Sequence, residues 1–181
     1  MTLHFFLLGG LLLAALGGLA TAWYCFRLNP PRIPAAEQLT RNRYWGSVIA
    51  LLALAWCVPQ GQALAWDWLL PYLWPLVGIF TVLAFFFLDY LFARAIGGLL
   101  ILAAYYFLQE SFALDIKLAL SGAVLAWSIG LIGILISAKP CYLRDAFRFL
   151  ARHGSARYAA VGYALLITFY CGAAIALNWK A

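Results

Sequence analysis

The sequence predicts an all-α membrane protein, namely a bundle of six transmembrane helices with one short basic amphipathic helix at the membrane interface. Of its 181 residues, 67% are hydrophobic and 10% are charged, whereas soluble domains average about 45–50% apolar and about 25% charged residues. A soluble domain of this length cannot bury so much apolar surface. The composition therefore excludes a water-soluble enzyme and a nucleic-acid-binding module, and no nucleic acid is expected as a partner despite the net charge of +6.

The apolar runs are uniform and rich in Leu and Ala, which favours helices over the alternating segments of a membrane barrel. The runs cover residues 3–26, 44–58, 69–109, 116–138 and 158–178. About 20 apolar residues are needed to cross roughly 30 Å of hydrocarbon. The second run is short unless it begins near Leu39, and Pro59 is expected to close it. A five-span bundle is the alternative if one short run only enters the interface.

The run 69–109 is predicted to form two helices. As a single helix it would be roughly 60 Å long, about twice the thickness of the hydrocarbon core. Its only charged residues are Asp89 and Arg94, so we place the turn there, where the two side chains can pair. The pair Gly97-Gly98 is the alternative turn.

The basic residues of the loops are distributed asymmetrically. Three alternate loops, 27–43, 89–94 and 139–157, hold ten of the 12 Lys and Arg residues, and the opposite side holds only Lys117 and Lys180. Basic loops mark the cytoplasmic side of a membrane protein. We therefore expect a multi-pass protein of the plasma (inner) membrane with both termini outside. The short loops and the lack of a targeting peptide indicate a bacterial membrane.

The first apolar run is expected to remain as a helix. The pattern Ala20-x-Ala22 resembles a signal-peptide cleavage site after an apolar region. However, the first four residues contain no Lys or Arg, and cleavage would leave the basic loop 27–43 outside. Residues 1–181 are therefore expected to form a single integral membrane domain without a soluble domain.

Two predicted helices carry small residues at a spacing of four. These residues are Gly10, Ala14, Gly18 and Ala22 in the first helix, and Gly122, Ala126 and Gly130 in the fifth. Lipid provides no hydrophobic driving force between helices, so association depends on the close backbone approach that small residues allow. Both faces are therefore predicted to pack helices within the chain or to dock a partner subunit or a second copy.

Residues 139–153 are predicted to form the amphipathic helix, with Pro140 at its start and Gly154 after its end. Its two faces consist of Leu143, Ala146, Phe147, Leu150 and Ala151, and of Arg144, Asp145, Arg148 and Arg152. A helix of this kind lies on the membrane surface. We expect Arg144, Arg148 and Arg152 to contact anionic lipid headgroups on the cytoplasmic side.

The sequence shows no constellation that is typical of catalysis, and no charged residue lies deep in a predicted span. His4 and His153 are predicted on opposite sides of the membrane, which argues against a haem or a histidine metal site. None of the four cysteines forms a CxxC pair. No catalytic residue, cofactor or metal ligand is therefore predicted.

Three functions are compatible with this sequence. The leading prediction is a non-catalytic accessory or scaffolding subunit of a membrane complex, whose partners are the bilayer and other membrane subunits or a second copy. The alternative is a small-solute carrier or pore, in which Asp89 and Arg94 act as gate residues. The third is a lipid-modifying membrane enzyme, because arginines in the cytoplasmic loops can hold phosphate headgroups.

Overall fold

The computed structural model describes residues 2–62, 66–114 and 116–178, which are almost entirely helical and contain no strand. The predicted class, an all-α membrane bundle, is confirmed. The helices are α1 (Thr2–Arg27), α2 (Ile33–Arg41), α3 (Arg43–Gln62), α4 (Leu73–Phe87), α5 (Leu91–Ala113), α6 (Ala119–Ala138), α7 (Cys141–Arg152) and α8 (Gly154–Asn178), with the short 3-10 turns η1 (Pro30–Arg32) and η2 (Leu70–Tyr72).

Five helices among the described residues are long and apolar enough to cross a membrane. They contain the segments Leu7–Arg27, Leu70–Phe87, Leu91–Ala113, Ala119–Ala138 and Gly154–Asn178. The second predicted span, residues 44–58, corresponds to the shorter apolar segment Arg43–Pro59 of α3. Each predicted span therefore has a helix, and the number that cross the bilayer stays a prediction.

One predicted boundary is wrong, and the turn within the run 69–109 lies at the first of its two predicted places. Pro59 does not close the second run, because α3 continues through it to Gln62. Proline in a helix loses one backbone hydrogen bond, and transmembrane helices tolerate this loss better than soluble ones. The alternative turn at Gly97-Gly98 is not present, because α5 continues through both glycines. The turn between α4 and α5 is residues 88–90, with Tyr90 in the left-handed region at a φ of 54°.

The basic loop 27–43 contains a helix that the sequence analysis did not predict. Helix α2 follows η1, whose prolines restrict the backbone before the helix begins. Ala36 and Thr40 are both buried, and their spacing of four places them on one face. A pair of small residues in a polar segment is a weak signal, so the helix was not recognisable from hydropathy.

The described chain divides into two compact units. The described residues of unit 1 lie within Met1–Ile33, Ala103–Ile129 and Asp145–Ala181. The described residues of unit 2 lie within Pro34–Leu102 and Gly130–Arg144. Helices α5, α6 and α7 contribute residues to both units.

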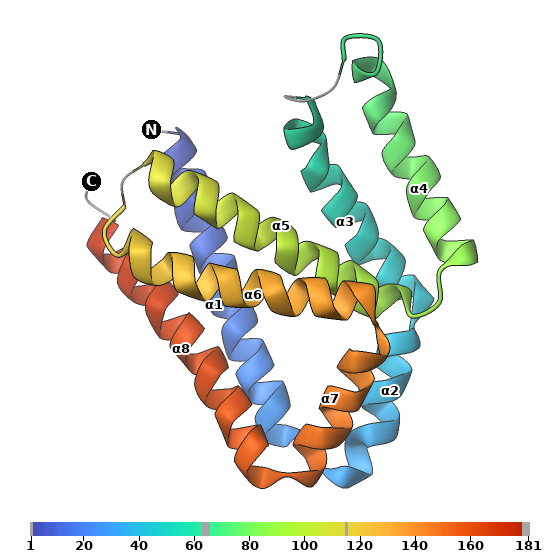
Figure 1. Cartoon of the computed structure of the whole chain (residues 1–181), viewed down its shortest axis with the longest axis vertical. Coiled ribbons are helices and arrows are strands. Elements are labelled where there is room, and N and C mark those ends of the chain that lie inside the picture. The colour runs from blue at the N-terminus through green and yellow to red at the C-terminus, as the bar shows by residue number, and fades with distance from the viewer. Residues whose placement is uncertain (1, 63–65, 115, 179–181) are drawn as a thin grey trace. The chain divides into compact units, whose positions relative to one another are not determined.

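In unit 1, α1 and α8 lie side by side and antiparallel (Figure 1). At one end, Leu7, Leu8 and Leu11 of α1 pack in a buried cluster with Cys171 and Ala174 of α8. At the other end, Arg157 of α8 donates a hydrogen bond of 3.1 Å to the carbonyl oxygen of Leu28 and one of 2.7 Å to Oδ1 of Asn29. The start of α1 and the end of α8 therefore lie at the same end of unit 1.

The turn between α5 and α6 lies at that end of unit 1 too. Oδ1 of Asn178 accepts a hydrogen bond of 3.0 Å from the backbone N–H of Lys117. The hydroxyl of Tyr170 donates to the carbonyl oxygen of Leu118 at 3.1 Å. Leu118 is in the left-handed region with a φ of 70°. The two side chains of α8 thus hold a turn that costs strain in a non-glycine residue.

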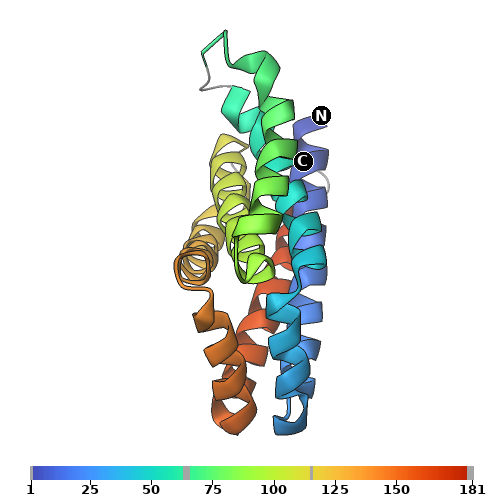
Figure 2. The ribbon, with the colours of Figure 1, turned by 90° about the vertical axis from the view of Figure 1, so that its right-hand side faces the viewer.

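In unit 2, α3 and α4 form an antiparallel hairpin, which Figure 2 shows from the side. The aromatic rings of Tyr44 and Phe85 lie 5.8 Å apart near one end of this hairpin. At the same end, the guanidinium of Arg41 lies 5.5 Å from the ring centroid of Tyr90. Residues 41–44 and 85–90 therefore meet at one end of unit 2. The prediction that loops 27–43 and 89–94 lie on one side of the membrane requires such a meeting.

Candidate functional site

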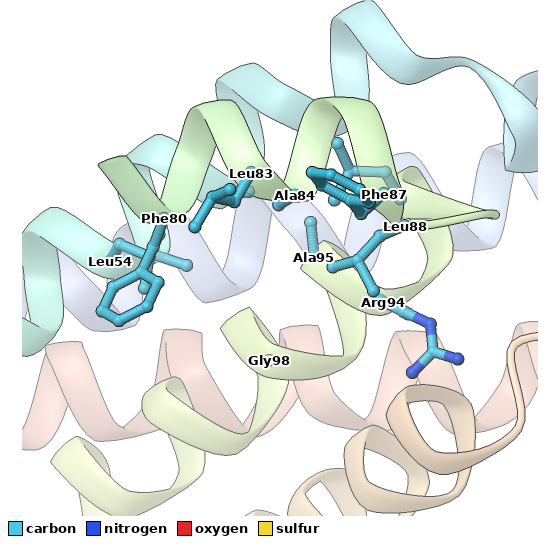
Figure 3. Close-up of a pocket in the computed structure, with 12 residues that line it drawn as sticks. Leu54, Phe80, Leu83, Ala84, Phe87, Leu88, Arg94, Ala95 and Gly98 are labelled. Atoms are coloured by element: carbon cyan, nitrogen blue, oxygen red, sulfur yellow. The ribbon is translucent and has the colours of Figure 1, made fainter. Parts of the chain in front are cut away.

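An open apolar groove lies between α3, α4 and α5 in unit 2 (Figure 3) and has a volume of about 420 Å³. It is lined by Ala50, Ala53, Leu54, Phe80, Leu83, Ala84, Phe87, Leu88, Leu91, Arg94, Ala95 and Gly98. Arg94 is the charged member of this lining. This volume is within the range of about 300–1,000 Å³ that small-molecule sites occupy.

Small residues allow α3 and α5 to pack closely beside the groove. A Cβ placed on Gly46 would lie 2.5 Å from the backbone nitrogen of Phe92, so only glycine allows this approach. Next to this contact, Ala50, Leu91 and Ala95 form a buried cluster. Larger side chains of α4 line the groove. Two of them, Phe80 and Phe87, are more than half exposed.

Arg94 is held at one end of the groove by the packing of α5 on α6. A Cβ on Gly133 would lie 2.7 Å from the carbonyl oxygen of Gly97, so the two helix backbones touch there. This contact places the carbonyl oxygen of Ser137 3.2 Å from Nη1 of Arg94, which donates a hydrogen bond to it. Nε of Arg94 is buried and has no acceptor among the described residues.

The predicted pair of Asp89 with Arg94 is wrong. Oδ1 of Asp89 instead lies 3.3 Å from Nη2 of Arg43 at the start of α3. The reason is that α5 begins at Leu91, so Asp89 stays in the turn while Arg94 lies one helical turn farther along and faces α6. The Arg43–Asp89 pair is largely exposed, and such pairs contribute only about 0–1 kcal/mol.

The predicted small-residue face of α1 is split by the structure. Gly18 and Ala22 are buried, and a Cβ on Gly18 would lie 3.1 Å from the carbonyl oxygen of Ala164 in α8. Gly10 is half-buried, near the ring of Tyr106. Ala14 is exposed. A spacing of four advances about 40° around a helix at each step, so the four residues cannot share a single narrow face.

The predicted small-residue face of α6 lies partly in the core of unit 1. Gly122 and Ala126 are buried, and Gly122 faces the rings of Tyr170 and Phe107 so closely that a Cβ would overlap the tyrosine hydroxyl. Gly130 is half-buried. Gly133, farther along α6, makes the glycine contact with α5.

The predicted amphipathic helix is present as α7, and its apolar face contacts unit 1. The ring of Phe147 packs edge-on against Tyr24 of α1, with the ring centroids 5.7 Å apart, and Ala151 is buried. Arg144 and Arg148 are half-buried and have interaction partners, whereas Arg152 is exposed. Ala146 is exposed although it was assigned to the apolar face.

Polar side chains between the helices of unit 1 form bonds that sequence reasoning missed. The hydroxyls of Ser128 in α6 and Tyr163 in α8 share a hydrogen bond of 2.5 Å. The hydroxyl of Thr168 donates to the carbonyl oxygens of Ala164 at 3.0 Å and, across to α1, of Ala15 at 3.4 Å. Hydroxyls in apolar runs were the only available signal, and they do not identify a partner.

Within the described ranges, no group of three or more His, Cys, Asp and Glu side chains is arranged to hold a metal ion. Comparisons of the chain with models of protein families, with curated proteins and with solved structures find no match. The functional argument therefore depends on the geometry of the chain alone.

Proposed function

We propose that the protein is a non-catalytic, multi-pass membrane protein that acts as an accessory or scaffolding subunit of a larger membrane complex. The observation that supports this proposal is a second small-residue face on α1, formed by Ala14, Gly17 and Thr21, which the chain leaves exposed. A Cβ placed on Gly17 would meet no heavy atom within 4 Å. At about 100° per residue, this face is centred roughly 90° away from the buried Gly18 and Ala22.

An exposed face of this kind suits another transmembrane helix better than lipid. Small residues let two backbones approach closely, and this approach drives association where the hydrophobic effect is absent. The hydroxyl of Thr21 donates to the carbonyl oxygen of Gly17 at 2.8 Å, so no unpaired polar group interrupts the face. The partner that fits is a transmembrane helix with a small-residue face of its own, from another subunit or a second copy.

The proposed orientation puts both termini outside and the basic loops in the cytoplasm of a bacterial inner membrane. The ten-to-two distribution of Lys and Arg in the sequence supports it. The start of α1 and the end of α8 lie at one end of unit 1, as an even number of crossings requires. Labelling of single cysteines introduced at Arg41 and Lys117 tests this orientation, because the reagent should reach Lys117→Cys from outside and Arg41→Cys only after permeabilisation.

Helix α7 is proposed to lie at the cytoplasmic surface, where Arg152 contacts anionic headgroups. Its exposed guanidinium supports this role, which is worth about 1 kcal/mol per cation near an anionic surface. Arg144 and Arg148 share the basic face but also interact within the chain, so their headgroup contacts are expected to be weaker.

The experiment that tests the proposed function compares three leucine variants after purification in mild detergent. Gly17→Leu should abolish the assembly while the chain stays folded, because the added side chain points into open space. Gly162→Leu is the matched control, since a Cβ there also meets nothing within 4 Å. Gly18→Leu should instead lower the thermal stability, because it collides with α8.

Light scattering gives the mass of each assembly, and circular dichroism gives its thermal unfolding. The proposal is supported if only Gly17→Leu reduces the mass without lowering stability. An assembly that Gly17→Leu leaves intact, or a wild-type chain that purifies alone as a monomer, would contradict it.

A further inference from the structure

We propose that the groove of unit 2 binds one acyl chain of an anionic phospholipid from the surrounding bilayer, with the lipid phosphate at Arg94. This site is distinct from the α1 face of the proposed function. The occupant follows from the apolar lining of the groove and from the arginine at its end.

The lining of the groove is suited to a hydrocarbon chain. Apart from Arg94, the lining consists of Ala, Leu, Phe and Gly residues, so the groove offers an acyl chain no competing polar partner.

Arg94 marks the position of the headgroup. Figure 3 shows it beside Leu88, at the end of the groove opposite Leu54 and Phe80. Its Nη1 bonds to the neutral carbonyl oxygen of Ser137, and its buried Nε has no acceptor in the described part of the chain. Among the described residues, no carboxylate bonds to this half-buried guanidinium, and a cation beside apolar surroundings is costly without an anionic partner.

The nearest carboxylate in the sequence does not neutralise Arg94. Asp89, the carboxylate of the adjoining turn, is paired with Arg43, and Arg41 lies over the ring of the next residue, Tyr90. The carboxylate of this turn is therefore already paired with another arginine and does not bond to Arg94. Arginine binds phosphate through two parallel hydrogen bonds, and basic pockets between transmembrane helices are typical sites for anionic headgroups.

The first experiment measures lipid retention by the full chain with native mass spectrometry in detergent. Dioleoyl phosphatidylglycerol and dioleoyl phosphatidylcholine are titrated separately, so that the acyl chains match and only the headgroup charge differs. The wild-type chain should retain one phosphatidylglycerol most tightly. Arg94→Gln should weaken its binding about tenfold, and the control Arg32→Gln, at an exposed arginine of η1, should leave it unchanged.

The second experiment blocks the groove itself. A Cβ on Gly98 meets nothing within 4 Å, so the side chain of Gly98→Leu can occupy the groove without a backbone collision. Gly98→Leu should reduce retention of both lipids at this site. Gly78→Leu, which also adds a side chain into open space but outside the groove lining, should not.

Several results would overturn the proposal. One is equal retention of the two lipids by the wild-type chain. Another is wild-type retention of phosphatidylglycerol by Arg94→Gln or by Gly98→Leu. A change of oligomeric state in Gly98→Leu, without loss of lipid, would assign the groove to a partner helix instead. If Arg94→Gln does not fold, Arg94→Lys and Gly98→Leu decide the question, because Arg94→Lys should keep a preference for phosphatidylglycerol.

Discussion

A single methyl group on Gly133 should destabilise the bundle through its contact between α5 and α6. The added Cβ would lie 2.7 Å from the carbonyl oxygen of Gly97 and 3.1 Å from the backbone nitrogen of Ile101. Both of these atoms belong to the backbone, so no rotamer change relieves the contact and the helices must move apart. Overpacking of this kind costs about 1–3 kcal/mol.

The matched control for this prediction is Gly78→Ala in α4, where the new Cβ meets nothing within 4 Å. Both changes replace glycine by alanine inside a helix, which by itself stabilises by up to about 1 kcal/mol. This gain cancels in the comparison. Gly133→Ala should therefore unfold with a free energy about 1–3 kcal/mol lower than that of Gly78→Ala.

Reversible unfolding in detergent micelles, followed by circular dichroism, measures both free energies of unfolding. The glycine contact is a required feature of the bundle if Gly133→Ala is the less stable variant by this margin. Equal stabilities for the two variants would refute the reasoning, since they would mean that α5 and α6 adjust without cost.

Three smaller effects follow from individual polar contacts. A double-mutant cycle with Ser128→Ala and Tyr163→Phe, read by thermal unfolding, should give a coupling near 0.6 kcal/mol, the average for hydrogen bonds between membrane helices. Asn178→Ala should destabilise by about 1–2 kcal/mol and speed hydrogen exchange at the amide of Lys117, which mass spectrometry detects. Asp89→Asn should change the unfolding free energy by less than about 1 kcal/mol, because its ion pair is exposed.

The class of fold and most helix positions could be predicted from hydropathy alone. The length of the run 69–109 required a turn, and its charged residues located that turn to within a few positions of residues 88–90. Hydropathy works here because the bilayer fixes the length of each apolar helix. It gives no information about pairs of helices, which depend on side-chain shape.

The partners of Arg94 and Gly97 show what this limit means. Asp89 was the nearest charge in sequence, yet Arg94 bonds to the Ser137 carbonyl on α6. A backbone acceptor has no sequence signature. Gly97 suggested a turn because glycine is common in turns, whereas its role is to let two helix backbones touch.

The sequence predicted that small residues of α1 pack closely, but it did not predict which of them face the rest of the chain. A spacing of four places Gly10 and Ala22 about 120° apart on a straight helix. The structure buries Gly18 and Ala22 against the chain and exposes Ala14 beside Gly17. The predicted face therefore divides into a buried part and an exposed part. The exposed part, together with Gly17, is the face on which the proposed function is argued.

The mass of the assembly in the native membrane tests the central claim most directly. Membranes that contain the chain are extracted with a nanodisc-forming copolymer, without detergent, and native mass spectrometry gives the mass of each particle. An accessory or scaffolding subunit should appear as the 20.0 kDa chain together with a second polypeptide or a second copy in fixed ratio. Particles that hold one 20.0 kDa chain and lipid alone would contradict the account.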